Sequence, residues 1–262
     1  SSVEDMSKWV TMILNEGKYG NNLEKQLISK KTLRELMTLQ TVIKGSTPYN
    51  THFFGYGLGF FLSDQKGYFV AEHTGGLGGM VTQVTMIPEM KIGIIVLTNQ
   101  QSGYAFTTIT NQLKDSYFGI KGTDRLKEYT AMEKSNQGEG DEVTDKVWAK
   151  IKNQKQKIDF SPYLGKYKDP WFGEIEVIER NGQLYFKSAR SPQLQGKMHY
   201  LEGNTFVAAW NDRSMNADSY VNFSLDEQGK ANSIKMKAVS PLTDFSFDFH
   251  DLDLKRAKEQ EK

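Results

Sequence analysis

The stretch Glu72-His73-Thr74-Gly75-Gly76-Leu77-Gly78-Gly79 lies in the middle of four runs with strand character. These runs are short, rich in β-branched and aromatic residues, and separated by polar or Pro-containing turns. They are Tyr56 to Leu62, Gly67 to Ala71, Met80 to Ile87 and Lys91 to Thr98. Their spacing predicts an antiparallel meander that carries the glycine cluster at the end of its second strand.

Glycines at a strand end allow positive φ and allow another group to approach the main chain closely. A His followed by Thr at such an edge presents side-chain donors and free N–H groups, which favours a ligand-binding edge. The alternative is a glycine-rich hairpin that merely follows a His, because four-residue motifs recur by chance.

The run from Gly55 to Asn99 resembles the third-motif region of the serine β-lactamase and penicillin-binding-protein superfamily, in particular the branch around class C β-lactamases and related esterases. There a strand carries Lys-Thr-Gly or His-Thr-Gly. Here His73-Thr74-Gly75-Gly76 is followed by Ile87-Pro88-Glu89 and then by Gly93 to Asn99. The resemblance implies a serine hydrolase that acts through an acyl-enzyme on an ester, peptide or β-lactam.

The resemblance also implies a role for each residue of the motif. His73 takes the position of the cationic third-motif residue, and Thr74 faces the substrate. The backbone N–H of Gly76, just past Gly75, is one of two oxyanion donors, because acyl transfer develops negative charge on a carbonyl oxygen.

The other two motifs of that superfamily are Ser-x-x-Lys and Tyr-x-Asn. Ser63-Asp64-Gln65-Lys66 spells the first but occupies a predicted turn, whereas the catalytic version opens a helix so that Lys lies one turn below Ser. Tyr19-Gly20-Asn21 and Tyr220-Val221-Asn222 are interpreted as chance matches. The chain also starts without Met on a helix signal. We therefore expect a C-terminal portion whose nucleophile lies upstream, so that this chain alone is inactive.

Composition excludes several classes of function. The chain has 262 residues with 33 basic and 32 acidic side chains, a net charge of +1, which gives no electrostatic case for nucleic acid or an anionic membrane. It has no Cys, hence no disulfide or thiolate metal site. Its four His residues lack metal-ligand spacing, and Asp248 and His250 are predicted on the solvated face of a strand. Neither a metal nor a cofactor is expected. By family resemblance, the location is periplasmic or secreted in a bacterium.

Helices are predicted on both sides of the meander. Residues 6–14 have a helical apolar period with Ser2 as N-cap, and a second helix follows, capped by Ser29 or Thr32, with Thr32 and Glu35 also fitting a capping box. Residues 103–118 predict a third helix with an apolar side formed by Phe106, Ile109, Thr110 and Leu113.

From residue 120 charged residues dominate. The segment 135–140 is predicted to break two helices, the second of which turns Val147, Trp148 and Ile151 inward. From residue 163 the period switches to two, and Asn181-Gly182 predicts a type I′ hairpin. About eight strands are predicted: 163–168, 172–179, 183–188, 197–202, 205–211, 219–225, 233–238 and 245–251.

This rhythm, with Tyr163-Leu164-Gly165-Lys166-Tyr167, resembles the lipocalin-like domain at the C-terminus of some β-lactamase-related hydrolases. The barrel aromatics are expected to fill a core, although a ligand cavity is the alternative.

The fold class predicted is α+β. Residues 1–119 form an incomplete β-lactamase-like domain, an antiparallel sheet with flanking helices. Residues 120–158 form a helical linker, and residues 159–262 an all-β lipocalin-like barrel. Expected partners are a small-molecule, peptide or ester substrate, the upstream half of the same protein, and a second copy through the exposed sheet. A non-catalytic binding protein that uses the barrel is the alternative function.

Overall fold

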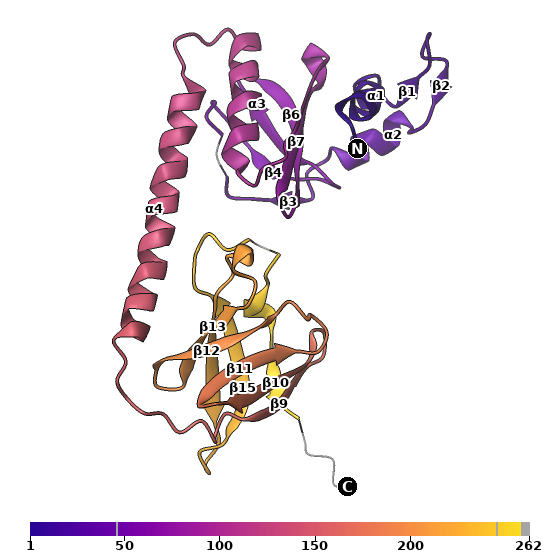
Figure 1. The fold of residues 1–262 in the computed structure, drawn as a ribbon. Helices are drawn as coiled ribbons and strands as arrows, with labels where there is room; N and C mark the ends of the chain where they lie inside the picture. The colour runs from indigo at the N-terminus through magenta and orange to yellow at the C-terminus, as the bar shows by residue number, and fades with distance from the viewer. Residues whose placement is uncertain (46, 245, 258–262) are drawn as a thin grey trace. The chain divides into compact units, whose positions relative to one another are not determined.

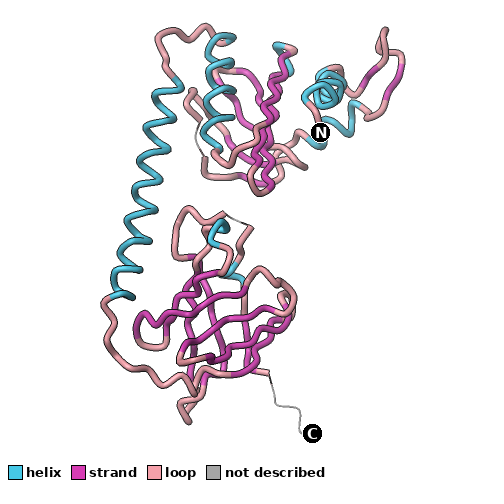
Figure 2. The backbone as a smooth tube through the Cα atoms, viewed as in Figure 1, coloured by secondary structure: helices cyan, strands magenta, loops and turns pink. Residues whose placement is uncertain are grey.

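A computed structural model describes residues 1–45, 47–244 and 246–257. The chain divides into two units, Ser1–Glu133 and Lys134–Lys262. Helices flank a sheet in the first unit, whereas the second is mainly β-structure (Figures 1 and 2). The predicted domain limits at residues 119 and 158 stay predictions.

The first unit is built on an antiparallel sheet of six strands in the order β3-β4-β5-β6-β7-β8. The predicted meander is therefore confirmed, although β6 continues through the glycine cluster instead of ending before it. The strands are β3 (Thr41–Val42), β4 (Phe54–Tyr56), β5 (Phe61–Gln65), β6 (Tyr68–Leu77), β7 (Met80–Ile87) and β8 (Ile92–Leu97). A separate hairpin joins β1 (Lys18–Tyr19) to β2 (Lys25–Gln26), and the 3-10 turn η1 (Pro88–Met90) joins β7 to β8.

Two predicted helices precede the sheet. Ser2 caps α1 (Val3–Leu14) by accepting a hydrogen bond from Asp5 N at 3.1 Å, and Ser29 caps α2 (Lys30–Leu36) by accepting one from Thr32 N. Ser29 is therefore the N-cap of α2, and the alternative prediction of Thr32 as the cap is wrong. Helix α1 packs on β8, where a Cβ on Gly93 would lie 2.2 Å from Val10 Cγ1. Glycine there lets helix and strand approach closely. The shared core consists mainly of Val10, Met12, Ile13, Leu14, Leu33, Phe60, Leu62, Ala71 and Met86.

Helix α3 (Gly103–Tyr117) forms where it was predicted, but the side that it buries shares only Thr110 and the half-buried Phe106 with the predicted side. Thr110, Asn111, Lys114 and Asp115 are the buried residues. Ile109 and Leu113 are 46% and 43% exposed, so the prediction of an inward apolar side is wrong for both. The reason is a polar network beneath the helix, in which the buried side chains find their partners.

Helix α4 (Arg125–Lys152) runs without a break, so the predicted interruption at residues 135–140 is wrong. A Cβ on Gly140 would lie 2.4 Å from Leu242 Cδ1, so this glycine admits a contact with a distant loop. That contact accounts for a glycine inside a helix, where it otherwise costs about 1 kcal/mol. As predicted, Val147, Trp148 and Ile151 pack inward, against Leu201, Val207 and Val239.

The second unit contains a closed antiparallel barrel of eight strands, as the sequence predicted. Asn181 and Gly182 have φ of 53° and 73°, which agrees with the type I′ turn. The strands are β9 (Gly165–Asp169), β10 (Gly173–Arg180), β11 (Gln183–Ser188), β12 (Gln195–Glu202), β13 (Thr205–Trp210), β14 (Ser219–Leu225), β15 (Ala231–Ala238) and β16 (Leu254–Arg256). The 3-10 turn η2 (Arg213–Met215) precedes β14. Buried aromatic side chains fill the interior, including Trp210, Tyr167 and Phe206.

The prediction of the last strand is wrong. Its residues 246–251 include the 3-10 turn η3 (Phe249–Asp251), and Phe245 lies outside the described residues. Phe249 is buried against the core and stacks on Trp210 at 5.9 Å, so this segment covers one barrel end. The later strand β16 closes the ring by pairing with β9 and β15. Arg256 secures that seam by donating hydrogen bonds to Leu164 O, Pro162 O and Tyr167 OH.

Candidate active site

The four predicted site residues lie consecutively on β6. His73, Thr74, Gly75 and Gly76 pair with residues 84 to 81 of β7. On the other side of β6, strand β5 pairs only as far as Glu72. Among the described strands, β6 therefore has a free edge from His73 onward, and these residues are exposed. A free strand edge offers N–H and C=O groups to a ligand.

The His73 ring is held by aromatic neighbours. The hydroxyl of Tyr56, on β4, lies 2.9 Å from His73 Nε2. The Phe61 ring stacks on the imidazole, with centroids 5.8 Å apart and planes at 25°. Tyr56 and Phe61 contact each other edge to face at 4.8 Å. These contacts orient the imidazole while its side chain stays open to solvent.

The glycines of the motif serve different purposes. A Cβ on Gly75 would lie 2.7 Å from Thr82 Oγ1, whereas a Cβ on Gly76 would meet nothing within 4 Å. Gly76 therefore leaves open space beside the strand. Of the four glycines between Gly75 and Gly79, only Gly79 has positive φ, at 84°, and its N–H donates to Gln101 Oε1 at 2.7 Å. Of these four glycines, only Gly79 therefore uses the positive φ that glycine allows.

A buried lysine lies behind the strand. Lys114 of α3 is 3% exposed and donates to Gln65 Oε1 at 3.0 Å. Its ammonium group is 3.8 Å from Glu72 Oε2, which also accepts a hydrogen bond from Thr85 at 3.2 Å. Burial lowers the pKa of Lys114, and the charges of Glu72 and Asp115 oppose that effect. Because Glu72 immediately precedes His73, this cluster ties α3 to the site strand.

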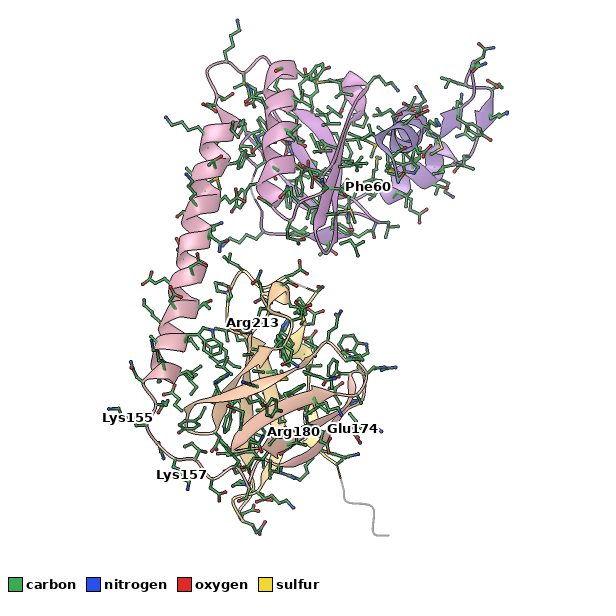
Figure 3. The ribbon with its side chains drawn as sticks, in the orientation of Figure 1. Phe60, Lys155, Lys157, Glu174, Arg180 and Arg213 are labelled. Atoms are coloured by element: carbon green, nitrogen blue, oxygen red, sulfur yellow. The ribbon has the colours of Figure 1, made fainter. Side chains whose placement is uncertain are left out.

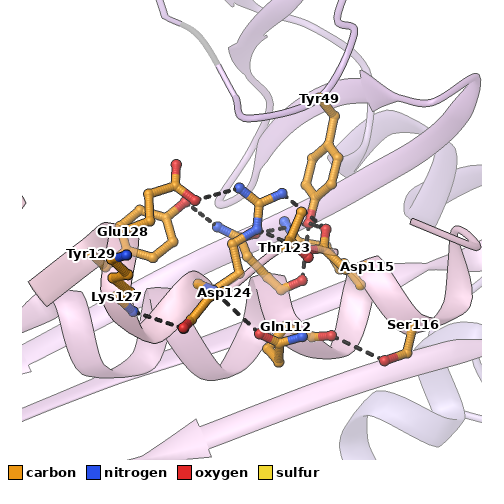
Figure 4. A network of polar contacts seen from close by, with 12 residues as sticks. Tyr49, Gln112, Asp115, Ser116, Thr123, Asp124, Lys127, Glu128 and Tyr129 are labelled. Carbon is orange, nitrogen blue, oxygen red and sulfur yellow. Dashed lines mark hydrogen bonds and ion pairs between the residues drawn. The ribbon is translucent and has the colours of Figure 1, made fainter. Parts of the chain in front are cut away.

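The cluster continues into the network of Figure 4, centred on Asp115. Arg125 donates to both carboxylate oxygens of Asp115, at 2.7 and 3.0 Å, and Thr123 and Tyr49 donate at 2.7 and 3.0 Å. Burial opposes ionisation of Asp115, but these hydrogen bonds, led by that of Arg125, hold its pKa below the usual value. Burial and the neighbouring Asp115 raise the pKa of Tyr49.

The apparent Ser-x-x-Lys does not form a catalytic arrangement. Ser63 is 1% exposed within β5, where its hydroxyl accepts a hydrogen bond from Gln65, and Lys66 lies in the following turn with φ of 55°. Ser63 and Lys66 do not lie on a helix, which confirms the prediction. Residues 63–65 belong to strand β5, however, and only Lys66 lies in the predicted turn. Of the two Tyr-x-Asn matches, Tyr220-Val221-Asn222 lies on barrel strand β14.

Sequence reasoning missed Tyr56 and Lys114 as neighbours of the site. Tyr56 is 17 positions from His73, and only the pairing across β4, β5 and β6 brings them together. Lys114 was not singled out from the sequence, because a lysine in a helix is normally exposed. The sequence did contain a signal for the buried side of α3, because the polar residues 110, 111, 114 and 115 recur with helical spacing on one side.

Only one group of possible metal ligands occurs in the described part of the chain. Asp248, His250 and Asp251 each have a ligand atom within 4.8 Å of the others. All three are exposed, and they belong to the turn around η3 instead of the predicted outer strand face. Exposed acidic groups often gather without an ion, so this geometry assigns no metal.

The two units match different families. Residues 1–117 match the beta-lactamase family, and residues 149–256 match a domain of unknown function, DUF3471. Unguisins hydrolase ungD of Aspergillus violaceofuscus (strain CBS 115571) is 28% identical over 134 residues, which are 48% of this chain and 24% of that protein. The chain thus spans about a quarter of the length of this curated relative.

Two solved structures are similar at low scores. The octameric penicillin-binding protein homologue from Pyrococcus abyssi has a TM-score of 0.39 and 18% identity, covering 97% of this chain and 46% of that chain. SurE has a TM-score of 0.30 and 12% identity, covering 95% of this chain and 47% of that chain. Neither score carries an argument about function.

The family match supports a β-lactamase-like fold for the first unit. The predicted superfamily resemblance is confirmed at that level. Among the described helices, none is long and apolar enough to span a bilayer.

Proposed function

We propose that this chain supplies the third-motif strand of a β-lactamase-related serine hydrolase that cleaves an ester, peptide or β-lactam through an acyl-enzyme. The observation that carries the proposal is the free, exposed edge of β6 at His73-Thr74-Gly75-Gly76, within residues that match the beta-lactamase family. An extended substrate can pair with such an edge through main-chain hydrogen bonds.

In this proposal His73 orients a carboxylate or hydroxyl of the substrate, and Tyr56 and Phe61 fix its ring. The Thr74 hydroxyl donates a hydrogen bond to the substrate. The N–H of Gly76 stabilises the developing oxyanion, and the lack of a side chain at this residue leaves room for the acyl group. Glu72 and Lys114 hold the strand from behind.

The nucleophile and its base would come from a Ser-x-x-Lys outside this chain, in the upstream part of the same protein. The fold around Ser63 supports this, because a Ser buried in a strand has no lysine one helical turn away. The chain alone is then inactive. A fluorescent penicillin and a fluorophosphonate should leave it unlabelled, and stoichiometric labelling at Ser63 would contradict the proposal.

The decisive experiment uses the longer polypeptide encoded with the upstream reading frame. Hydrolysis of p-nitrophenyl butyrate and nitrocefin is measured for the parent, His73→Ala and the control His52→Ala. His52 is also exposed and contacts an acidic residue, Asp64, in the same unit. We expect kcat/KM to fall about a hundredfold for His73→Ala, the scale of a lost transition-state contact, and to stay unchanged for His52→Ala.

Two results would contradict the proposal. One is an upstream reading frame without a Ser-x-x-Lys that opens a helix. The other is hydrolysis that survives His73→Ala unchanged. Either would favour the alternative, a non-catalytic binding protein that uses the barrel. A periplasmic or secreted location in a bacterium belongs to the same proposal and is tested by fractionation.

We also propose that the first unit pairs with a second copy of itself through the β8 edge. Strand β8 ends the sheet, having β7 as its neighbour. Beside it, α3 contacts β7 and β8 and exposes Ile109, Leu113 and Tyr117 at helical spacing. Unpaired edges and exposed apolar helix faces both favour association. The upstream half of the protein is the alternative occupant, and it would displace the second copy in the longer polypeptide.

A further inference from the structure

One end of the barrel is hollow. The connections 170–172, 189–194 and 211–218 and the described segments 239–244 and 246–253 meet there, whereas tight turns such as Asn181-Gly182 close the other end. The hollow has a volume of about 670 Å³, within the size range of small-molecule sites. Its apolar lining includes Trp171, Phe172, Leu194, Met215 and Phe247.

The floor of this cavity is closed and apolar. Phe249 and Leu252 are each 3% exposed, and Phe249 stacks on Trp210 of the barrel core. At the rim, the Trp171 side chain is 67% exposed. A tryptophan left open to solvent at the entrance of an apolar cavity provides a large surface that a ligand can cover.

The rim also carries a cation with unused donors. Arg190 lies across the mouth, where Nη1 donates to Trp171 O at 2.5 Å. Its stem passes over Gly173, within 3.8 Å of where a Cβ would stand. A guanidinium has five N–H donors, and within the described ranges no carboxylate forms an ion pair with this one. Arg190 is thus held in place with its charge unbalanced.

Asp248 also lines the cavity, but its carboxylate has other neighbours. It lies within 4.8 Å of the ligand atoms of His250 and Asp251. Neither His250 nor Asp251 lines the cavity, so the Asp248 carboxylate has its nearest titratable neighbours outside the cavity mouth. Arg190 is the one cationic side chain among the lining residues, and within the described ranges no ion pair joins it to Asp248, so its guanidinium is available to an anionic group.

We propose that the open end of the barrel binds a small amphipathic carboxylate. Its aliphatic or aromatic body lies against Trp171, Phe172 and Met215, and its anionic head accepts hydrogen bonds from Arg190. This site lies wholly in the second unit and does not depend on the proposed hydrolase activity.

The test uses the full chain and three ligands with the same ten-carbon tail, decanoate, decanol and decylamine. Binding is followed by tryptophan fluorescence and by calorimetry. Decanoate should bind saturably, one molecule per chain, more tightly than decanol and much more tightly than decylamine. The fluorescence change should disappear in Trp171→Phe, which assigns it to one of the four tryptophans.

Arg190→Gln should weaken decanoate binding about fivefold, the scale of a partly exposed ion pair, and leave decanol unchanged. The matched control is Arg180→Gln, an exposed arginine that ends β10 next to the tight turn at the opposite end (Figure 3). Arg190→Lys should retain the preference for decanoate over decylamine. If Arg190→Gln does not fold by circular dichroism, Trp171→Ala replaces it, with an expected loss of affinity for all three ligands.

The proposal is overturned if decanoate does not bind saturably, or if Arg180→Gln weakens it as much as Arg190→Gln. It is also overturned if decanoate, decanol and decylamine bind alike, or if affinity is unchanged in Trp171→Ala.

Discussion

Replacing Arg125 by Met tests whether the buried network under α3 stabilises the first unit. The substitution keeps the length and apolar stem of the side chain but removes both hydrogen bonds to Asp115. The carboxylate of Asp115 is 1% exposed and would retain only the hydroxyl donors Thr123 and Tyr49. A buried carboxylate that loses its cation costs about 3–5 kcal/mol. That loss approaches the whole margin of a small domain, about 5–15 kcal/mol.

The matched control is Arg213→Met in the barrel, at a residue labelled in Figure 3. Arg213 also pairs with an aspartate through two nitrogens, contacting Asp218 at 2.5 and 2.7 Å. Its side chain is 58% exposed, against 7% for Arg125. The Asp218 side chain is only 10% exposed, so this pair is half-solvated, and its loss should cost less than that of the fully buried pair. The two variants therefore compare the stability lost from the same kind of Arg–Asp pair with a buried arginine and with an exposed one.

Urea unfolding measures the free energies, and hydrogen exchange assigns each loss to its unit. We expect Arg125→Met to lower protection in α3 and β6 and to leave the barrel strands unchanged. Asp115→Asn in the same chain should recover part of the loss, because the orphaned charge is removed. The reasoning is refuted if the two Arg→Met variants cost the same, or if the barrel loses the protection.

Three further outcomes are expected. Gly76→Ala should lower kcat/KM of the longer polypeptide without changing its urea midpoint, because the added methyl enters open space on the substrate side. Burial would raise the pKa of Asp64, but hydrogen bonds from His52 and Phe53 outweigh it and lower this pKa to about 2. The contribution of Asp64 to stability should therefore be complete above about pH 4 and be lost as the pH falls through 2. Asp64→Asn should remove this loss of stability at low pH from an acid titration. Leu113→Glu should weaken self-association in sedimentation, whereas Leu126→Glu, an exposed leucine on α4, should not.

The barrel was the most predictable part of the fold. Strands 183–188 and 219–225 begin and end where the alternating pattern placed them. The alternation of apolar and polar residues is a local property of the sequence, and in a barrel it corresponds directly to side chains that point into the core or out to solvent. The last strand was misplaced because the alternating phenylalanines at 245, 247 and 249 follow the strand period, yet Phe247 and Phe249 pack against the barrel core without forming a strand. Only the long-range pairing of Leu254 with Ile234 locates the true strand.

The two helical errors have a different cause. The periodicity of α3 was correct, but apolar spacing alone assigned its buried side, and a polar network outweighed it. In α4 the two glycines suggested a break, and the contact of Leu242 at Gly140 gives one of them a structural role. In both cases partners distant in sequence decided the outcome. A local pattern does not contain them.

The free edge of the candidate site depends on a turn far from the motif. Strand β5 starts at Phe61 because residues 57–60 reverse the chain, with Gly57 N donating to Phe60 O at 2.8 Å. Helix α2 fixes that turn: Leu58 N donates to Leu36 O at 2.9 Å, and a Cβ on Gly57 would lie 2.4 Å from the same oxygen. The β4–β5 hairpin therefore ends level with Glu72, and from His73 onward β6 is paired with β7 alone. If α2 did not stop the hairpin there, a longer β5 would pair with the motif and occupy the N–H and C=O groups that a substrate needs. Access to the proposed site would therefore depend on the turn at Gly57, which lies outside the motif.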